Sequence, residues 1–188
     1  MNTQQTLRQL QNDLNEILQT FNQKFEKLSD KQIAWKPSPE KWNVAECLQH
    51  LNIANGFYVK KVDVILSKID KSEFPTKSEF DLSFQGKIFV NYIIDPKTKY
   101  KFSAPKVTKP RPDLDITKVK TKFVEIINTL QRQIVLSENL DLERIKIASP
   151  FTNLLKFTLG DVYMISARHT QRHVNQALRV IDLAEFPK

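Results

Sequence analysis

The sequence is poor in cysteine and glycine, with one cysteine and three glycines among 188 residues. A single cysteine excludes an internal disulfide, and so few glycines argue against a turn-rich all-β sandwich or barrel. The first residues also lack the basic and then apolar stretches of a secretory signal. We therefore expect a mainly helical, cytoplasmic protein.

Long apolar runs are missing as well. A helix that spans a bilayer needs roughly 18 uninterrupted apolar residues. The best candidate segment is interrupted by Lys60, Lys61, Asp63 and Lys68, so we expect a soluble chain without a membrane partner. An apolar fraction of 40% in 188 residues is enough for a buried core, and one domain over residues 1–188 is the simplest organisation.

The chain carries a net charge of +8, which would suit nucleic-acid binding if the charge were concentrated. The basic residues are instead spread along the sequence, and neither a basic recognition helix nor an RNA-binding aromatic motif accompanies them. The densest group lies in a proline-rich stretch that reads as a solvated loop: Lys97, Lys99, Lys101, Lys106, Lys109 and Arg111, beside Pro96, Pro105, Pro110 and Pro112. We expect no nucleic-acid partner.

Apolar residues recur at steps of three and four in four segments, which predicts amphipathic helices over about 3–28, 43–69, 116–139 and 158–183. Asn43 with Glu46, and Thr158 with Asp161, have capping-box spacing at two helix starts. Within the long link after the second helix, residues 82–94 fit a short helix or an extended pair. Such a link can return along the bundle, so the fold class predicted is an all-α four-helix bundle with up-down-down-up order.

The chain has only three histidines, and two of them, His169 and His173, are four residues apart on the last predicted helix. This spacing places both rings on one face, where they can bind one metal ion. Small and apolar residues share that face, so the rings should point inward. Two plainer interpretations stay open, namely a chance pair on a polar face and a hydrogen-bonded pair in the core.

Two motifs extend the pattern. Trp35-x-Pro37 precedes Trp42-Asn-Val-Ala-Glu-Cys-Leu-Gln-His50-Leu51, and the last helix carries His169-Thr-Gln-Arg-His173-Val-Asn-Gln176. Together with the proline-rich crossover between them, these motifs resemble the DinB/YfiT-like superfamily over nearly the whole chain. The resemblance implies a four-helix bundle of unusual connectivity that holds a divalent metal ion, often Ni²⁺ or Zn²⁺, with His50, His169 and His173.

The resemblance also guides the expected activity. Relatives include thiol S-transferases that use bacillithiol or mycothiol, a mycothiol-dependent isomerase and proteins regarded as metal-dependent hydrolases. We expect a metal-dependent thiol S-transferase that acts on electrophilic small molecules. A metal-dependent hydrolase and a non-catalytic metal-binding stress-response module are the alternatives. A homodimer is also expected, although the sequence locates no interface.

Several residues near the histidines have two interpretations each. Glu46 either caps its helix, which we favour, or supports His50 from behind. Gln176 either donates to a bound water or ligand atom or makes an interhelical hydrogen bond. Cys47 is expected to be a packed thiol. Trp35 and Trp42 can cover the bundle end or wall a substrate pocket, and we favour simple core packing for both. Arg172 should be solvated or salt-bridged and is given no catalytic role.

Overall fold

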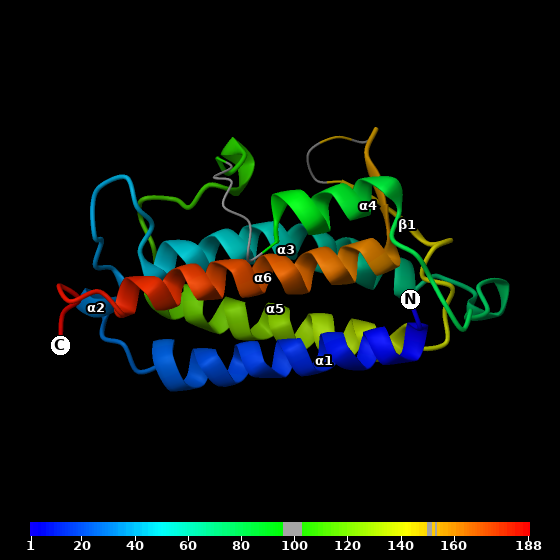
Figure 1. Ribbon diagram of the computed structural model, residues 1–188, viewed down its shortest axis with the longest axis horizontal. Coiled ribbons are helices and arrows are strands. Elements are labelled where there is room, and N and C mark those ends of the chain that lie inside the picture. Colours follow the sequence, from blue (N-terminus) through cyan, green and yellow to red (C-terminus); the bar gives the residue numbers. More distant parts are fainter. Residues whose placement is uncertain (96–102, 150–151, 153) are drawn as a thin grey trace.

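The computed structural model describes residues 1–95, 103–149, 152 and 154–188. Its main elements are four long helices that lie side by side: α1 (Thr3–Thr20), α3 (Val44–Leu66), α5 (Ile116–Leu136) and α6 (Leu159–Ile181) (Figure 1). Helices α1 and α3 each pack against both α5 and α6. Following the colours of Figure 1 from blue to red, α1 and α6 run in one direction along the bundle and α3 and α5 run in the opposite direction. This confirms the predicted up-down-down-up order.

Shorter elements connect the long helices: η1 (Phe21–Phe25), α2 (Asp30–Ile33), η2 (Lys71–Glu73), α4 (Phe84–Ile88), η3 (Phe89–Ile93) and η4 (Lys106–Thr108). The first predicted helix, 3–28, is thus α1 continued by the π-helical η1. Residues 82–94, for which the sequence predicts either a short helix or an extended pair, contain the helices α4 and η3. From the predicted basic cluster, Lys97, Lys99 and Lys101, with Pro96, lie outside the described residues.

Two local structures were not anticipated. One is α2, in which Ser29 and Gln32 form a complete capping box. The other is a hairpin of β1 (Lys146–Ala148) and β2 (Lys156–Thr158), antiparallel with Ile147 opposite Phe157. This hairpin leads directly into α6, because the last residue of β2, Thr158, is also the N-cap of that helix.

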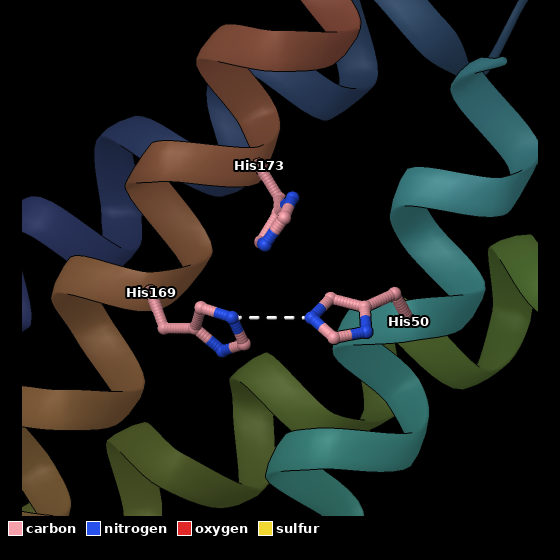
Figure 2. Close-up of side chains that lie close together, drawn as sticks. All are labelled: His50, His169 and His173. Atoms are coloured by element: carbon pink, nitrogen blue, oxygen red, sulfur yellow. Dashed lines mark hydrogen bonds between the residues drawn. The ribbon is translucent and has the colours of Figure 1, made fainter. Parts of the chain in front are cut away.

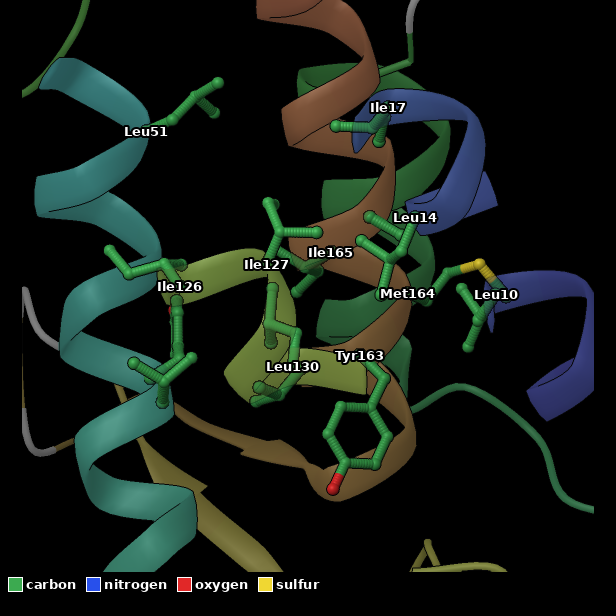
Figure 3. Close-up of a cluster of buried hydrophobic side chains, with 14 of the residues drawn as sticks. Leu10, Leu14, Ile17, Leu51, Ile126, Ile127, Leu130, Tyr163, Met164 and Ile165 are labelled. Carbon is green, nitrogen blue, oxygen red and sulfur yellow. The ribbon is translucent and has the colours of Figure 1, made fainter. Parts of the chain in front are cut away.

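The core is built from the apolar stripes that the sequence periodicity predicts. Figure 3 shows side chains from α1, α3, α5 and α6 meeting between the helices, including Leu10, Leu14, Ile17, Leu51, Ile126, Ile127, Leu130 and Tyr163. Burial of such side chains contributes about 25 cal/mol per Å² of apolar surface. The Tyr163 hydroxyl also donates to the Gln133 carbonyl at 3.0 Å, so its polar end is satisfied inside the core. None of the described helices is long and apolar enough to cross a bilayer.

Asp161 joins the start of α6 to the crossover. Its carboxylate accepts from the Thr158 N–H at 2.8 Å, which completes the predicted capping box. The same carboxylate accepts from the Ser83 N–H and hydroxyl, at 2.9 and 2.5 Å. Ser83 in turn caps α4, so one buried carboxylate fixes two helix starts. The Gly86 backbone packs directly against this group, and a Cβ there would overlap the carboxylate.

We expect Gly86→Ala to lower the free energy of unfolding by about 1–3 kcal/mol, because the added methyl group must displace the buried carboxylate. Gly56→Ala is the matched control. A Cβ at Gly56 meets its nearest neighbour at 3.8 Å, and in mid-helix the change should stabilise by roughly 0.5–1 kcal/mol. Urea unfolding measures both values. Equal effects from the two substitutions would contradict this account of Asp161.

Candidate metal centre

Antiparallel packing of α3 and α6 brings the three histidines together. His50 lies in the second turn of α3, whose start is fixed by the Asn43 and Glu46 capping box. His169 lies at the middle of α6 and His173 one turn later, and Figure 2 shows all three rings pointing into the space between the two helices. Each ring offers one nitrogen, and these three atoms all lie within 4.8 Å of one another.

The spacing of two of the nitrogens fits a shared metal ion. His50 Nε2 and His169 Nε2 are 3.1 Å apart. Two nitrogens that each lie roughly 2.0–2.1 Å from one ion have this separation when they subtend about 100° at the ion. The third ring lies close to both of the others, because the His173 centroid lies 4.5 Å from that of His50 and 4.7 Å from that of His169. The donor set is three imidazoles with no carboxylate or thiolate among them.

Two of the rings have hydrogen bonds that fix which nitrogen is free. The His50 Nδ1–H donates to the Thr108 carbonyl at 2.7 Å, since a carbonyl only accepts. The His173 Nδ1–H donates to the Gln176 Oε1 at 2.9 Å. Each of these tautomers leaves a lone pair on Nε2, and in this structure the His50 Nε2 accepts from the His169 Nε2–H at 3.1 Å (Figure 2). Metal-binding histidines commonly have such a partner for the second nitrogen.

Burial keeps the rings neutral. Removal from water lowers the pKa of His50, and it lowers the pKa of His169 further, with the neighbouring rings of His173 and His50 adding to the effect. The pKa of His173 falls to about 3, chiefly through burial. Neutral imidazole is the form that binds metal. The ring of Trp42 closes one side of the cluster, with its centroid 4.9 Å from that of His50 and 5.6 Å from that of His173.

The structure resolves the open interpretations of the nearby residues. Glu46 caps α3 by accepting from the Asn43 N–H at 2.9 Å, and it pairs with Lys36 at 2.9 Å. Its carboxylate therefore bonds to these two residues and not to His50. Cys47 is a packed thiol whose pKa is raised by burial. The Gln176 Oε1 accepts from the His173 Nδ1–H on the same helix at 2.9 Å, so Gln176 supports a histidine of the cluster and this bond is not an interhelical one.

Trp35, Trp42 and Arg172 occupy different positions relative to the three histidines. Trp35 packs edge-on against Phe186 near the carboxyl end, with centroids 5.7 Å apart, away from the histidines. Trp42 instead forms a wall of the site. Arg172 is only partly buried and donates to the Asp95 carbonyl at 2.7 Å, which anchors the end of η3 to α6.

Thr108 is the residue of the site that sequence reasoning missed. It is 1% exposed and contributes a backbone carbonyl, which any residue type would supply. Its place in the sequence, inside a stretch read as a solvated loop, gave no sign of burial. The one available signal was the proline content around it, since prolines rigidify a segment that must hold a fixed position.

The fold and the site together define a class of protein. It is an up-down-down-up helix bundle with a three-histidine cluster between its second and last long helices. The chain belongs to the DinB superfamily, whose family model matches residues 6–177. This membership confirms the resemblance drawn from the tryptophan and histidine motifs.

A solved structure shares this fold. It is that of YfiT from Bacillus subtilis, described as "a probable metal-dependent hydrolase with an unusual four-helix bundle topology". The two structures align with a TM-score of 0.55 and 16% sequence identity, over 93% of this chain and 85% of that one. No curated protein matches the chain. At this identity the likeness shows a common fold.

Acid is expected to destabilise the metal-free protein through these histidines. Their pKa values are lower in the folded state than the ordinary 6.5, so the unfolded chain binds more protons as the pH falls below 6.5. The free energy of unfolding should therefore fall with pH between about 6.5 and 4.5, by up to about 1.4 kcal/mol per pH unit for each histidine.

His173→Gln tests this assignment, because it removes one of the three contributions. Urea unfolding in the presence of a chelator, at steps of pH across that window, should give a shallower pH dependence for the variant than for the parent. Parallel curves would refute the burial of a neutral His173.

Proposed function

We propose that His50, His169 and His173 hold one divalent metal ion, and that this centre transfers a low-molecular-weight thiol to an electrophilic small molecule. The observation that carries the proposal is three neutral imidazole nitrogens within 4.8 Å, two of them oriented by their own hydrogen bonds. Imidazole donors suit Zn²⁺ and Ni²⁺, which we propose as the ions held.

A bound divalent ion supplies Lewis acidity, which lowers the pKa of a water or thiol that it coordinates. The surrounding residues favour a thiol. In the described part of the chain, the hydrogen-bond and ring contacts of the histidines reach Thr108, Gln176 and Trp42, none of which is a carboxylate. Hydrolysis usually needs a general base for water, whereas a thiol ionises near pH 8.5 without one.

The chain's own residues then have distinct tasks. The Thr108 carbonyl and the Gln176 side chain hold His50 and His173 with Nε2 free. Trp42 keeps water away from two of the three rings and presents an apolar face. His169 is surrounded by protein, yet its side chain keeps more solvent-accessible surface than those of His50 and His173, so we place the approach of a substrate on its side. In the transfer, a carbon–sulfur bond forms, the leaving group departs as an anion and the thiol proton passes to solvent.

Hydrolysis is the second candidate, supported by the description of the YfiT structure. It would use the same three histidines with water as the nucleophile. The two activities are separated by whether turnover requires a thiol. A centre that binds metal and turns over neither kind of substrate would be the non-catalytic module.

The purified protein is expected to contain about one divalent ion per chain at neutral pH, measured by elemental analysis. Loss of a partner that only orients a ligand typically costs 10–100-fold in affinity, so His50→Ala, His169→Ala and His173→Ala should each cost more than about 100-fold. Cys47→Ala is the control, because Cys47 is buried near His50 and contributes no donor to the cluster. Full metal content in all three histidine variants would refute the site.

Thiol transfer is expected with an activated haloarene and a panel of thiols that includes bacillithiol, mycothiol, glutathione and cysteine. The rate should depend on added thiol, stop with a chelator, and fall at least about 100-fold in His169→Ala. Cys47→Ala should keep the parent rate, which excludes the protein's own thiol as the nucleophile. Ester or amide cleavage without thiol, and no thiol-dependent turnover, would favour the hydrolase instead.

A further inference from the structure

We propose that Gln49 is a positioning residue for His50, which it controls through the crossover segment 105–111. The proposal rests on the proposed metal centre for its functional meaning. It concerns a side chain whose hydrogen bond goes to the backbone of Arg111 and which acts on the His50 ring through that backbone.

Two adjacent side chains of α3 hold the crossover at two points. The His50 Nδ1–H donates to the Thr108 carbonyl at 2.7 Å, and the Gln49 Oε1 accepts from the Arg111 N–H at 2.5 Å. The two crossover positions are three residues apart, so segment 105–111 lies along the first turns of α3. A displacement at Arg111 therefore moves the carbonyl that orients His50.

The composition of the segment makes Gln49 its main anchor on that side. Pro110 and Pro112 have no N–H, and the Lys109 N–H is directed at the Lys106 carbonyl at 3.4 Å. Among the backbone groups of residues 109–112, the Arg111 N–H is thus the donor that remains for a hydrogen bond to a residue outside the segment. Gln49 supplies the acceptor, and its backbone is fixed within a regular helix.

Hydrogen bonds within the segment hold its first residues together. The Thr108 N–H and hydroxyl both donate to the Pro105 carbonyl, at 2.9 and 3.1 Å, and these bonds close the short helix η4. Thr108 and His50 are 1% and 4% exposed, so water does not readily replace a lost partner of the His50 ring. Without the Gln49 anchor, His50 loses the bond that selects its Nδ1–H tautomer and fixes the ring.

Gln49→Leu tests the inference, because leucine keeps the bulk and removes the acceptor. Gln49→Glu keeps an oxygen acceptor and should restore the parent behaviour. Gln11→Leu is the matched control. Gln11 is also of intermediate exposure, and its side chain makes one hydrogen bond to a distant backbone group, the Gln131 carbonyl, at 2.8 Å.

The first measurement uses metal-free protein at pH 7.5, where ¹⁵N chemical shifts report the protonated ring nitrogen of each histidine. In the parent and in Gln49→Glu, His50 should be the Nδ1–H tautomer. In Gln49→Leu its two nitrogens should move toward averaged shifts, while Gln11→Leu keeps the parent spectrum. An unchanged His50 in Gln49→Leu would overturn the proposal.

The second measurement is zinc affinity by competition with a chromophoric chelator. Gln49→Leu should weaken binding by up to about 10-fold, because it acts on the partner of His50 and not on the ring itself, and Gln11→Leu and Gln49→Glu by less than about twofold. Parent affinity in Gln49→Leu would also overturn the proposal. If His50→Ala bound zinc as tightly as the parent, the proposed metal centre would fail, while the chemical shifts would still decide the role of Gln49.

Discussion

Burial of three imidazole rings beside one another constrains the rest of this structure. Each neutral ring has one donor and one acceptor nitrogen, and a buried nitrogen without a partner costs about 1–3 kcal/mol. Two of the rings satisfy a nitrogen with Thr108 and Gln176, and each then directs its other nitrogen at the common centre. The helix bundle has to place α3, α6 and the crossover around that centre at once.

The up-down-down-up order meets this requirement. Antiparallel α3 and α6 put the start of one beside the end of the other, which is where His50 and His173 lie. Parallel α3 and α5 require the chain to travel back along the bundle between them (Figure 1). The return path passes the first turns of α3, and η4 is the part of it that reaches His50. The crossover is therefore part of the site as well as a connection.

Periodicity and capping patterns predicted the long helices, because each has a continuous apolar stripe, and both predicted capping boxes, Asn43 with Glu46 and Thr158 with Asp161, form at helix starts. The i, i+4 spacing of His169 and His173 likewise predicted a shared face. The hairpin was missed because three-residue strands such as Lys146–Ala148 are too short for an alternating pattern. The four-residue helix α2 was missed, although Ser29 and Gln32 carried its signal.

Other features depend on tertiary packing that no local pattern encodes. The contribution of Thr108 is a backbone carbonyl, and the place of Trp42 against two histidines follows from the path of the chain into α3. Gln176 and Glu46 each had two chemically reasonable partners. Glu46 bonds to Asn43 and Lys36, and Gln176 accepts from His173 one turn before it, and the helix pattern alone did not decide between these partners and the others.

The separation of His50 and His169 along the chain, 119 residues, has a consequence for how the centre is assembled. No fragment that ends before α6 contains more than one of the three donors, so a growing chain offers no complete site until its last helix has been made. Closing so long a loop is entropically costly and is offset only when the core packs. The complete metal centre therefore forms with the finished fold, and an ion bound there reports that the first and last parts of the chain have come together.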